Sequence, residues 1–314
     1  MTGGAGFIGS NFVEMALSGH FPSITKVLVL DKLTYAGKMS NLSSVKDNKN
    51  FEFFLGDICD SEIVENLVSR VDAIVNFAAE SHVDRSIQNS TEFIKTNILG
   101  TQILLDAARK HQVKKFVQIS TDEVYGSILE GSWDENEPLQ PNSPYSASKA
   151  AADLLVRAYF VTHKLNVNIT RCSNNFGPRQ DPEKLIPQSI QRLLRNQKIS
   201  LYGDGLNIRD WLFVEDHCKG VYLVLTEGIP GEIYNIGGGT ELSNLTLAKL
   251  LLKSLGKNDD YIEYVSDRPG HDLRYSVSHH KISSLGYSPS GNFNDSLEKT
   301  VSWYLNESIP KNDN

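Results

Sequence analysis

A tyrosine and a lysine stand four residues apart in the segment Tyr145-Ser-Ala-Ser-Lys149, at the start of a stretch with helical periodicity. Residues at this spacing lie on one face of a helix, so the phenol and the ammonium are predicted to be neighbours. A nearby ammonium stabilises phenolate and lowers the pKa of tyrosine. Tyr145 would then take a proton from a hydroxyl while a hydride leaves to a dinucleotide. The simpler interpretation is an exposed pair, because this spacing is common by chance.

Two adjacent acids, Asp122 and Glu123, follow the apolar run 115–120, within the segment Ser120-Thr-Asp-Glu-Val-Tyr-Gly126. Their side chains are expected at the carboxyl rim of a parallel sheet, where ligands bind. Two carboxyls in different environments can act as general acid and general base, the pair needed to remove water across a carbon-carbon bond. The alternative is an acidic helix start, since the helix dipole favours acids there.

A glycine motif, with Gly3, Gly6 and Gly9, leads into another stretch with helical periodicity. Its amides can therefore meet a pyrophosphate at a helix N-terminus. Asp31 ends the next strand about 22 residues after Gly9, where an acid would hydrogen-bond an adenosine ribose. A carboxylate there repels a 2′-phosphate, which favours NAD over NADP, although Lys32 beside it keeps NADP open.

Two further strand ends complete such a cofactor site. Asp57-Ile58, after the run 51–55, would hold the adenine edge. Ala78-Ala-Glu-Ser-His82, after the run 72–77, would pass beside the pyrophosphate and the nicotinamide ribose. Strand-end aspartates are also common turn formers, and small residues permit close packing. These two segments therefore add to the glycine motif and do not stand without it.

The elements that would position these residues alternate, over the first two thirds of the chain, as βαβ units do. Near-continuous apolar runs, typical of strands buried on both faces, occupy residues 26–30, 51–55, 72–77, 115–120 and 167–171. Segments with apolar residues at three- and four-residue spacing occupy residues 7–18, 61–69, 92–111 and 145–163. The sequence predicts an α/β fold with a doubly wound parallel sheet of the Rossmann type.

After about Cys172 the alternation gives way to loops rich in proline and glycine, shorter helices and one more strand-like run at 232–236. We predict a dinucleotide-binding domain over residues 1–173, joined by parts of 211–240. A smaller α/β lobe over residues 174–314 would bind the substrate. The cleft between the two would lie outside the carboxyl ends of the strands.

One expected element has no counterpart in the sequence. A dinucleotide fold needs an apolar strand directly before the glycine motif, normally the central strand, yet Gly3 is the third residue. Either a few residues precede the given sequence, or the chain folds without its central strand. The first is favoured, because a missing strand would leave unpaired edges on both neighbours.

Composition excludes several classes of protein. With 40% hydrophobic and 22% charged residues, the chain is neither disordered nor fibrous. A net charge of −7 without a long basic run argues against binding to nucleic acid or anionic membranes, and no apolar stretch is long enough to span a membrane. Cys59, Cys172 and Cys218 form no CxxC pair, which predicts neither disulfides nor a metal site and is typical of a cytoplasmic protein.

Together these motifs resemble the dTDP-glucose 4,6-dehydratases, a family of the extended short-chain dehydrogenase/reductases. The resemblance also rests on Asp31-Lys-Leu-Thr-Tyr-Ala-Gly37, Arg209-Asp-Trp211 and Asp267-Arg-Pro-Gly-His271, and it runs from Thr2 to about Leu305. The acidic pair discriminates best within the superfamily. Nucleotide-sugar 4-epimerases usually lack it, and sugar-nucleotide decarboxylases and GDP-mannose dehydratases tend to replace the aspartate by serine.

The resemblance implies a reaction in which dTDP-glucose loses water and becomes a 4-keto-6-deoxy sugar nucleotide. Tyr145, with Lys149, would deprotonate the 4-hydroxyl while carbon 4 gives hydride to NAD, and Thr121 would hold that hydroxyl. Glu123 would take the proton from carbon 5 while Asp122 protonates the departing 6-hydroxyl. Return of the hydride to carbon 6 would restore the cofactor, so no external reductant is needed.

The resemblance also implies two sets of binding residues. The cofactor residues would be Gly3, Gly6, Phe7, Ile8, Gly9, Asp31, Lys32, Leu33, Thr34, Asp57, Ile58, Ala78, Ala79, Glu80, Ser81, Thr96, Tyr145, Lys149 and Asn175. The nucleotide-sugar residues would be His82, Thr121, Asn174, Lys184, Leu185, Ser200, Leu201, Tyr202, Arg209, Asn244, Asp267, Arg268 and His271. A guanidinium suits a diphosphate because its fork donates two parallel hydrogen bonds, although a solvated surface arginine is the commoner case.

The helices expected at 92–111 and 145–163 are rich in apolar residues, namely Ile98, Leu99, Ile103, Leu104, Leu154, Leu155, Tyr159 and Phe160. Burial in the core is the simpler explanation. The resemblance implies a homodimer in which these two helices of each subunit form a four-helix bundle. Two other functions stay open: a UDP-sugar 4-epimerase or decarboxylase of the same superfamily, and a non-catalytic dinucleotide-binding protein.

Overall fold

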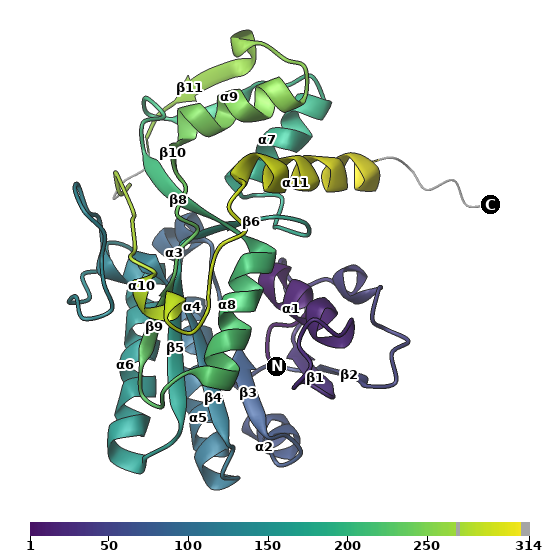
Figure 1. The fold of residues 1–314 in the computed structure, drawn as a ribbon, viewed down its shortest axis with the longest axis vertical. Coiled ribbons are helices and arrows are strands. Elements are labelled where there is room, and N and C mark those ends of the chain that lie inside the picture. The colour runs from purple at the N-terminus through teal and green to yellow at the C-terminus, as the bar shows by residue number, and fades with distance from the viewer. Residues whose placement is uncertain (268–270, 309–314) are drawn as a thin grey trace.

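The computed structural model describes residues 1–267 and 271–308, and its larger part is a parallel sheet (Figure 1). Four strands pair in the order β3 (Ala73–Asn76), β4 (Lys115–Thr121), β5 (Val167–Cys172) and β9 (Ile233–Ile236). β1 (Val27–Asp31) and β2 (Phe51–Leu55) form a second parallel pair. These are the strands that the apolar runs predict, so the parallel α/β fold of the Rossmann type is confirmed.

Residues Met1 to Gly3 lie between β1 and β3 and join the two groups of strands. Thr2 forms a parallel bridge with Leu30 on one side and with Asn76 on the other. The Thr2 amide donates to Val75 O at 3.2 Å, and the Gly3 amide donates to Leu30 O at 2.9 Å. The strand order is therefore β2, β1, Thr2, β3, β4, β5 and β9, and the residues directly before the glycine motif take the place of the expected first strand.

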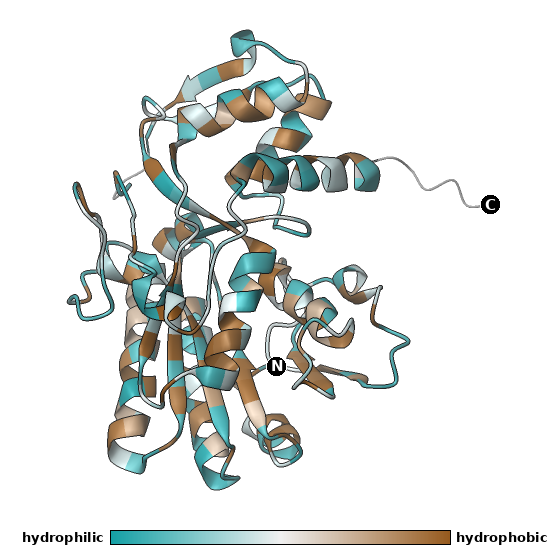
Figure 2. Cartoon of the chain, in the orientation of Figure 1, coloured by the Kyte–Doolittle hydropathy of each residue, from teal (hydrophilic) through white to brown (hydrophobic). Residues whose placement is uncertain are grey.

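Helices cover both faces of this sheet, as a doubly wound fold requires. On one face α1 (Phe7–Leu17) and α8 (Val214–Glu227) pack against strand residues such as Val29 and Val117. On the other face α2 (Ser61–Val68), α5 (Thr101–Lys110) and α6 (Pro144–His163) pack against residues such as Leu30 and Phe116. Figure 2 shows hydrophobic residues concentrated along the strands and along the helix sides that face them.

The predicted helix at 92–111 is one continuous helix with a π-helical segment inside it. It consists of α4 (Thr91–Phe93), the π-helical segment η2 (Ile94–Gly100) and α5. π-helical turns are rare in proteins, and those that occur are frequently found at functional sites. Here the segment buries two polar residues, Thr96 and Asn97, which the apolar periodicity does not predict.

A smaller group of elements lies beyond the carboxyl ends of the large sheet (Figure 1). β8 (Ile208–Phe213) pairs with β6 (Asn174–Phe176) in parallel and with β10 (Glu241–Ser243) in antiparallel orientation. β7 (Ile199–Tyr202) and β11 (Ile262–Val265) form a parallel pair. The accompanying helices are α7 (Leu185–Leu194), α9 (Asn244–Ser254) and α11 (Phe293–Ser308). These short strands have no clear sequence pattern of their own.

The chain returns to the large sheet after residue 213. α8 packs on that sheet, and β9 pairs with β5, so the run at 232–236 is a strand of the large sheet. The division of the chain at residue 173 stays a prediction. In the two described ranges, no helix combines the length and the apolar character needed to cross a membrane.

Candidate active site

One cavity runs along the carboxyl ends of the parallel strands, from the glycine motif to the acidic pair. It brings together most residues of the predicted site. They are Gly3, Gly6, Phe7, Ile8, Gly9, Asp31, Lys32, Thr34, Asp57, Ile58, Ala78, Ala79, Glu80, Ser81, Thr96, Thr121, Asp122, Glu123, Tyr145, Lys149, Asn174, Asn175 and Lys184. Parallel strands end at one edge of a sheet, which is why residues so far apart in sequence meet here.

The glycines of the motif stand where a side chain would collide with neighbouring backbone atoms. Gly3 has φ of 64°, and a Cβ there would lie 2.6 Å from the Ala78 amide nitrogen. A Cβ on Gly9 would collide with the Gly3 carbonyl oxygen. α1 starts at Phe7 with no side-chain cap on its first amides, so they are available to an anion in the cavity. This cradle fits a pyrophosphate.

Asp31 closes the loop that follows the motif. Its carboxylate accepts from the Ala5 amide at 2.9 Å and from the Leu33 amide at 2.8 Å. Leu33 itself lies beside the cavity with φ of 53°, and its side chain is half-buried against the core. The neighbouring Lys32 points to other partners, because its ammonium lies 3.5 Å from Asp57 and 3.3 Å from the Thr96 hydroxyl. The nearest cation is thus already neutralised by a carboxylate.

The tyrosine and lysine lie at the start of α6. Pro144 opens the helix, and Ser143 and Ser146 form a reciprocal capping box that fixes its first turn. Tyr145 and Lys149 are both buried. The Lys149 ammonium donates to the carbonyl of Ile119 at 2.5 Å, which anchors it to the end of β4.

In the chain by itself the pKa of Tyr145 is raised, and the lowering effect expected of Lys149 stays a prediction. Burial raises the pKa of the phenol well above its usual range, and the nearby Glu123 carboxylate and Cys172 raise it further. Burial also lowers the pKa of Lys149. The ammonium is directed at Ile119 O, and the spacing in sequence does not reveal that preference.

The acidic pair occupies the turn η3 (Asp122–Tyr125) directly after β4. Thr121 caps this turn, since its hydroxyl accepts from the Glu123 amide at 3.3 Å. The same hydroxyl donates to Asp122 Oδ1 at 3.2 Å and is hydrogen-bonded to the phenol of Tyr145. Thr121 therefore connects the acid turn with the tyrosine.

Asp122 is 2% exposed, and its Oδ2 has no hydrogen-bond partner within the described part of the chain. Burial raises the pKa of this carboxyl well above its usual range, and the charge of Glu123 adds to the rise. Two adjacent carboxyls in a buried site resist ionising together, so the surroundings of Asp122 favour its protonated form. This is the asymmetry that an acid and a base of similar chemistry need.

Several lining residues were not predicted. Ser120, Cys172 and Ser173 belong to the ends of β4 and β5, where the strand-end rule could have found them, as it could Ala36 and Gly37 in the loop after Asp31. Gln180 and Asp181 line the cavity without any signal in the sequence. Asn97 was also missed. Its amide group exchanges two hydrogen bonds with the Glu80 backbone, at 2.9 and 3.0 Å, and donates to the Ser148 hydroxyl at 2.8 Å.

The predicted nucleotide-sugar residues lie in several places. Asn174 and Lys184 line the cavity, and His82 is next to it with Nε2 3.1 Å from Glu183. Tyr202, Asp267 and His271 form a separate cluster. His271 Nδ1 lies 2.6 Å from Asp267 Oδ1, and the rings of Tyr202 and His271 meet edge to face. The remaining residues fall elsewhere. Leu185 starts α7, Ser200 bonds Glu263, Leu201 is buried in the core, Asn244 starts α9 and Arg268 lies outside the described residues.

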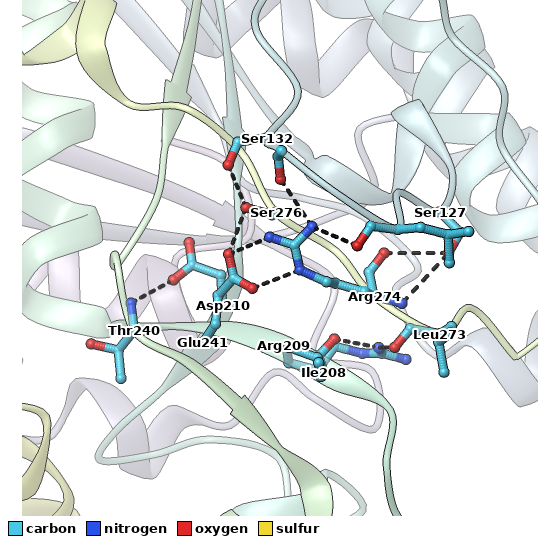
Figure 3. Close-up of polar contacts among 12 residues, drawn as sticks. Ser127, Ser132, Ile208, Arg209, Asp210, Thr240, Glu241, Leu273, Arg274 and Ser276 are labelled. Carbon is cyan, nitrogen blue, oxygen red and sulfur yellow. Dashed lines mark hydrogen bonds and ion pairs between the residues drawn. The ribbon is translucent and has the colours of Figure 1, made fainter.

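Arg209 is buried in the structure, contrary to the surface alternative. It donates to Asp272 O at 2.9 Å and to Ile208 O at 2.7 Å, and its guanidinium lies 4.5 Å from the centre of the Tyr275 ring. Figure 3 shows it beside a second arginine, Arg274, which no motif predicted.

Arg274 forms a bidentate ion pair with Glu241, at 2.7 and 2.8 Å. Figure 3 shows how Ser132, Ser276 and Ser127 extend this network to the loop that follows the acid turn. The two arginines thus fix the segment 272–276 against β8 and β10. Tyr275 belongs to this segment. Burial raises the pKa of the Tyr275 phenol, and the Glu123 carboxylate of the acid turn raises it further.

Comparison with known proteins gives consistent findings. The family model described as GDP-mannose 4,6 dehydratase matches residues 1–300. The dTDP-glucose 4,6-dehydratase of Streptomyces niveus is 55% identical, over 97% of this chain and 91% of the relative. DesIV, a dTDP-glucose 4,6-dehydratase from Streptomyces venezuelae crystallised with NAD and TYD bound, is 53% identical with a TM-score of 0.96, over 97% of this chain and 96% of that one. A UDP-glucose 4-epimerase from Thermotoga maritima, crystallised with UDP-glucose, is 30% identical with a TM-score of 0.90, over 98% of both chains.

The buried state of Asp122 predicts that Asp122→Asn stabilises the protein at neutral pH. A carboxyl whose pKa is raised on folding binds its proton more tightly in the folded state, so its contribution to stability falls as pH rises from the unfolded pKa toward the folded one. The asparagine side chain does not ionise, so the variant does not lose stability as pH rises. We expect the free energy of unfolding in urea to increase by roughly 1 kcal/mol or more at pH 7, and the gain to disappear near pH 3.

The exposed Asp47→Asn is the matched control and is expected to leave the free energy of unfolding unchanged. A variant at position 122 that is less stable than the wild type at pH 7 would show that Asp122 is a buried carboxylate with a favourable partner.

Proposed function

We infer that this protein, which belongs to the GDP-mannose 4,6-dehydratase family, is an NAD-dependent dTDP-glucose 4,6-dehydratase. Its product is dTDP-4-keto-6-deoxyglucose. The observation that carries this function is the pair of unlike carboxyls, Asp122 and Glu123, in one cavity with Tyr145 and Lys149. Oxidation alone needs only the tyrosine and lysine, whereas loss of water also needs an acid and a base.

The cavity fits NAD in its shape and in its charge. The uncapped start of α1 and the space left by Gly3 and Gly9 suit a pyrophosphate, and Asp31 suits a ribose with a free 2′-hydroxyl. When bound, NAD supplies a hydride acceptor for carbon 4 and gives the hydride back to carbon 6. The positive charge of its oxidised ring would, together with Lys149, favour the phenolate of Tyr145.

The proton steps are assigned to three residues, Tyr145, Glu123 and Asp122, supported by two others, Thr121 and Lys149. Tyr145 takes the proton of the 4-hydroxyl, with Thr121 as the hydrogen-bond partner that orients both groups and with Lys149 as the nearby cation. Once carbon 4 is a ketone, the hydrogen on carbon 5 is acidic, and Glu123 removes it. Asp122, held neutral by burial, gives its proton to the departing 6-hydroxyl, which leaves as water. Glu123 then returns a proton to carbon 5 as the hydride returns to carbon 6. Tyr145 has gained one proton and Asp122 has lost one, so proton exchange with solvent restores both residues, and the overall change is loss of one water.

The nucleotide half of the substrate is assigned to the smaller group of elements. Lys184 and Asn174 line the end of the cavity on that side. Tyr202, the last residue of β7, lies together with Asp267 and His271, which follow β11, and these residues offer an aromatic ring and two polar groups to a base or a diphosphate. The guanidinium of Arg209 packs on the Tyr275 ring. Arg209 also lies near the acid turn, where it would help to bind the sugar nucleotide.

The alternative functions are not favoured. The UDP-glucose 4-epimerase shares the fold at 30% identity, well below the dehydratases, and an epimerase needs no acid beside its tyrosine. A decarboxylase of this superfamily tends to lack the aspartate. A non-catalytic dinucleotide-binding protein has no use for a buried neutral carboxyl next to a second acid, which costs stability.

Glu123→Gln is expected to stop the reaction after oxidation, because glutamine has no basic oxygen to remove the proton from carbon 5. Quenched reactions analysed by mass spectrometry should show the 4-keto sugar nucleotide with its water still present, and formation of the dehydrated product should slow by about 10²-fold or more. The exposed Glu130→Gln serves as control and should turn over like the wild type. Normal dehydration by Glu123→Gln would remove Glu123 from the mechanism.

Preference for NAD over NADP is expected to depend on Asp31 and on the ion pair of Lys32 with Asp57. Calorimetry should show tighter binding of NAD, because a 2′-phosphate would meet the Asp31 carboxylate. Asp57→Asn frees the Lys32 ammonium and should narrow the gap between the two affinities. Tighter binding of NADP by the wild type would overturn this assignment.

We also propose a homodimer that works in the cytoplasm. Leu104 is buried in the core, as the simpler explanation requires, but other apolar residues of the same helices are exposed. On η2, Ile94 and Leu99 are 54% and 46% exposed, and on the adjacent α6, Leu154 and Val161 are 58% and 49% exposed. A four-helix bundle with a second copy would cover them. The three free cysteines are consistent with a reducing compartment.

Leu154→Lys is expected to weaken this dimer, because it places a charge in the centre of an apolar helix face. Sedimentation velocity at micromolar concentration should show dimer for the wild type and mainly monomer for the variant. Leu129→Lys, at a leucine in the loop after the acid turn that is 73% exposed, should remain dimeric. A wild type that sediments only as monomer would refute the dimer.

A further inference from the structure

A buried ion pair lies beside the active site and is not used by the proposed mechanism. Asp153 follows Lys149 by one turn of α6, and Arg171 is on β5. Arg171 Nε donates to Asp153 Oδ2 at 2.9 Å, and the two side chains are 3% and 1% exposed. Neither residue lines the cavity. A buried pair of this kind contributes little net stability, because the loss of hydration offsets the attraction.

The guanidinium of Arg171 also reaches the turn that carries the acids. Its NH1 donates to the hydroxyl of Tyr125 at 2.8 Å, and its central carbon lies 4.7 Å from the centre of that ring. The Tyr125 hydroxyl in turn donates to Asn235 Oδ1 on β9 at 2.9 Å. Tyr125 is the last residue of η3, whose first two residues are the catalytic acids. One guanidinium therefore connects the helix of Tyr145 and Lys149 with the turn of Asp122 and Glu123.

The pair acts electrostatically on Lys149 as well. Burial lowers the pKa of Lys149, and the Asp153 carboxylate one turn away opposes that effect, with a smaller contribution from Cys172. Burial likewise raises the pKa of Asp153, and Arg171 opposes it. Arg171 thus favours the charged form of Asp153, and the Asp153 carboxylate favours the charged form of Lys149.

We propose that Asp153, Arg171 and Tyr125 are positioning residues that hold the two halves of the active site in register. Asp153 supports the residues that oxidise carbon 4, and Tyr125 supports the acids that remove water. Arg171 joins the two halves. This assignment rests on the proposed dehydratase function. It adds that different residues, none of which touches the substrate, support the oxidation step and the loss of water.

Two conservative variants test the division, with quenched-flow mass spectrometry of dTDP-glucose turnover. Tyr125→Phe keeps the ring and loses only the hydroxyl. We expect oxidation at the wild-type rate and water loss slowed by about tenfold, so that the 4-keto sugar nucleotide accumulates. Asp153→Asn should instead slow oxidation by about tenfold, so that no intermediate accumulates. Tyr234→Phe removes a buried hydroxyl whose one hydrogen bond within residues 1–267 and 271–308 is accepted from the Ile229 amide at 3.0 Å, and it should change neither step.

A purely structural role would give a different result. Asp153→Asn leaves the charge of Arg171 buried without a counter-ion, so the protein is expected to lose stability. In the double variant Asp153→Asn/Arg171→Gln both charges are gone, and urea unfolding should return toward the wild-type midpoint while oxidation remains slow. Oxidation that recovers together with stability would overturn the proposal, and so would a Tyr125→Phe variant that slows both steps alike. A wild type that does not dehydrate dTDP-glucose would instead refute the proposed function, and the positioning roles with it.

Discussion

The exclusion of water at the end of β4 is the constraint on which the rest of the site depends. Asp122 lines the cavity with almost no exposure to solvent, and a second carboxyl follows it in the chain. In water the two acids would be nearly equivalent. Burial separates them, because it raises the pKa of the deeper carboxyl, Asp122. The roles of acid and base that we propose for the two residues depend on this difference in burial.

The scaffold holds each reacting group by a contact that is independent of substrate. The Lys149 ammonium is tied to a strand carbonyl, the Thr121 hydroxyl caps the acid turn, and Asn97 fastens the strand-end segment at Glu80 to the helix that carries Tyr145. Strand ends and helix starts are rigid, so the groups they carry keep their relative positions. Catalysis by several groups at once requires such fixed geometry, because displacements of about 1 Å can cost 10²-fold in rate.

The sequence was sufficient for the parts of the fold that repeat. Buried parallel strands appear as apolar runs, and their order places Asp31, Ala78 and Thr121 at one edge of the sheet. Features that depend on contacts between distant segments could not be predicted. The π-helical segment that buries Asn97, and the ion pair that links Arg274 to Glu241, have no local pattern. Short strands such as β6 are formed by pairing with β8, and their own residues do not indicate them.

The pKa of Tyr145 shows why the spacing of two residues is an incomplete guide to chemistry. The four-residue interval puts the phenol and the ammonium on one face of α6, yet the ammonium bonds Ile119 and the phenol is surrounded by acids and an apolar wall. A phenol in that setting holds its proton. In the chain by itself these surroundings favour the phenol over the phenolate, and a positive charge in the same cavity would oppose that effect. The cavity fits NAD, whose oxidised ring would supply such a charge, so binding of the cofactor and activation of the tyrosine would be linked by electrostatics.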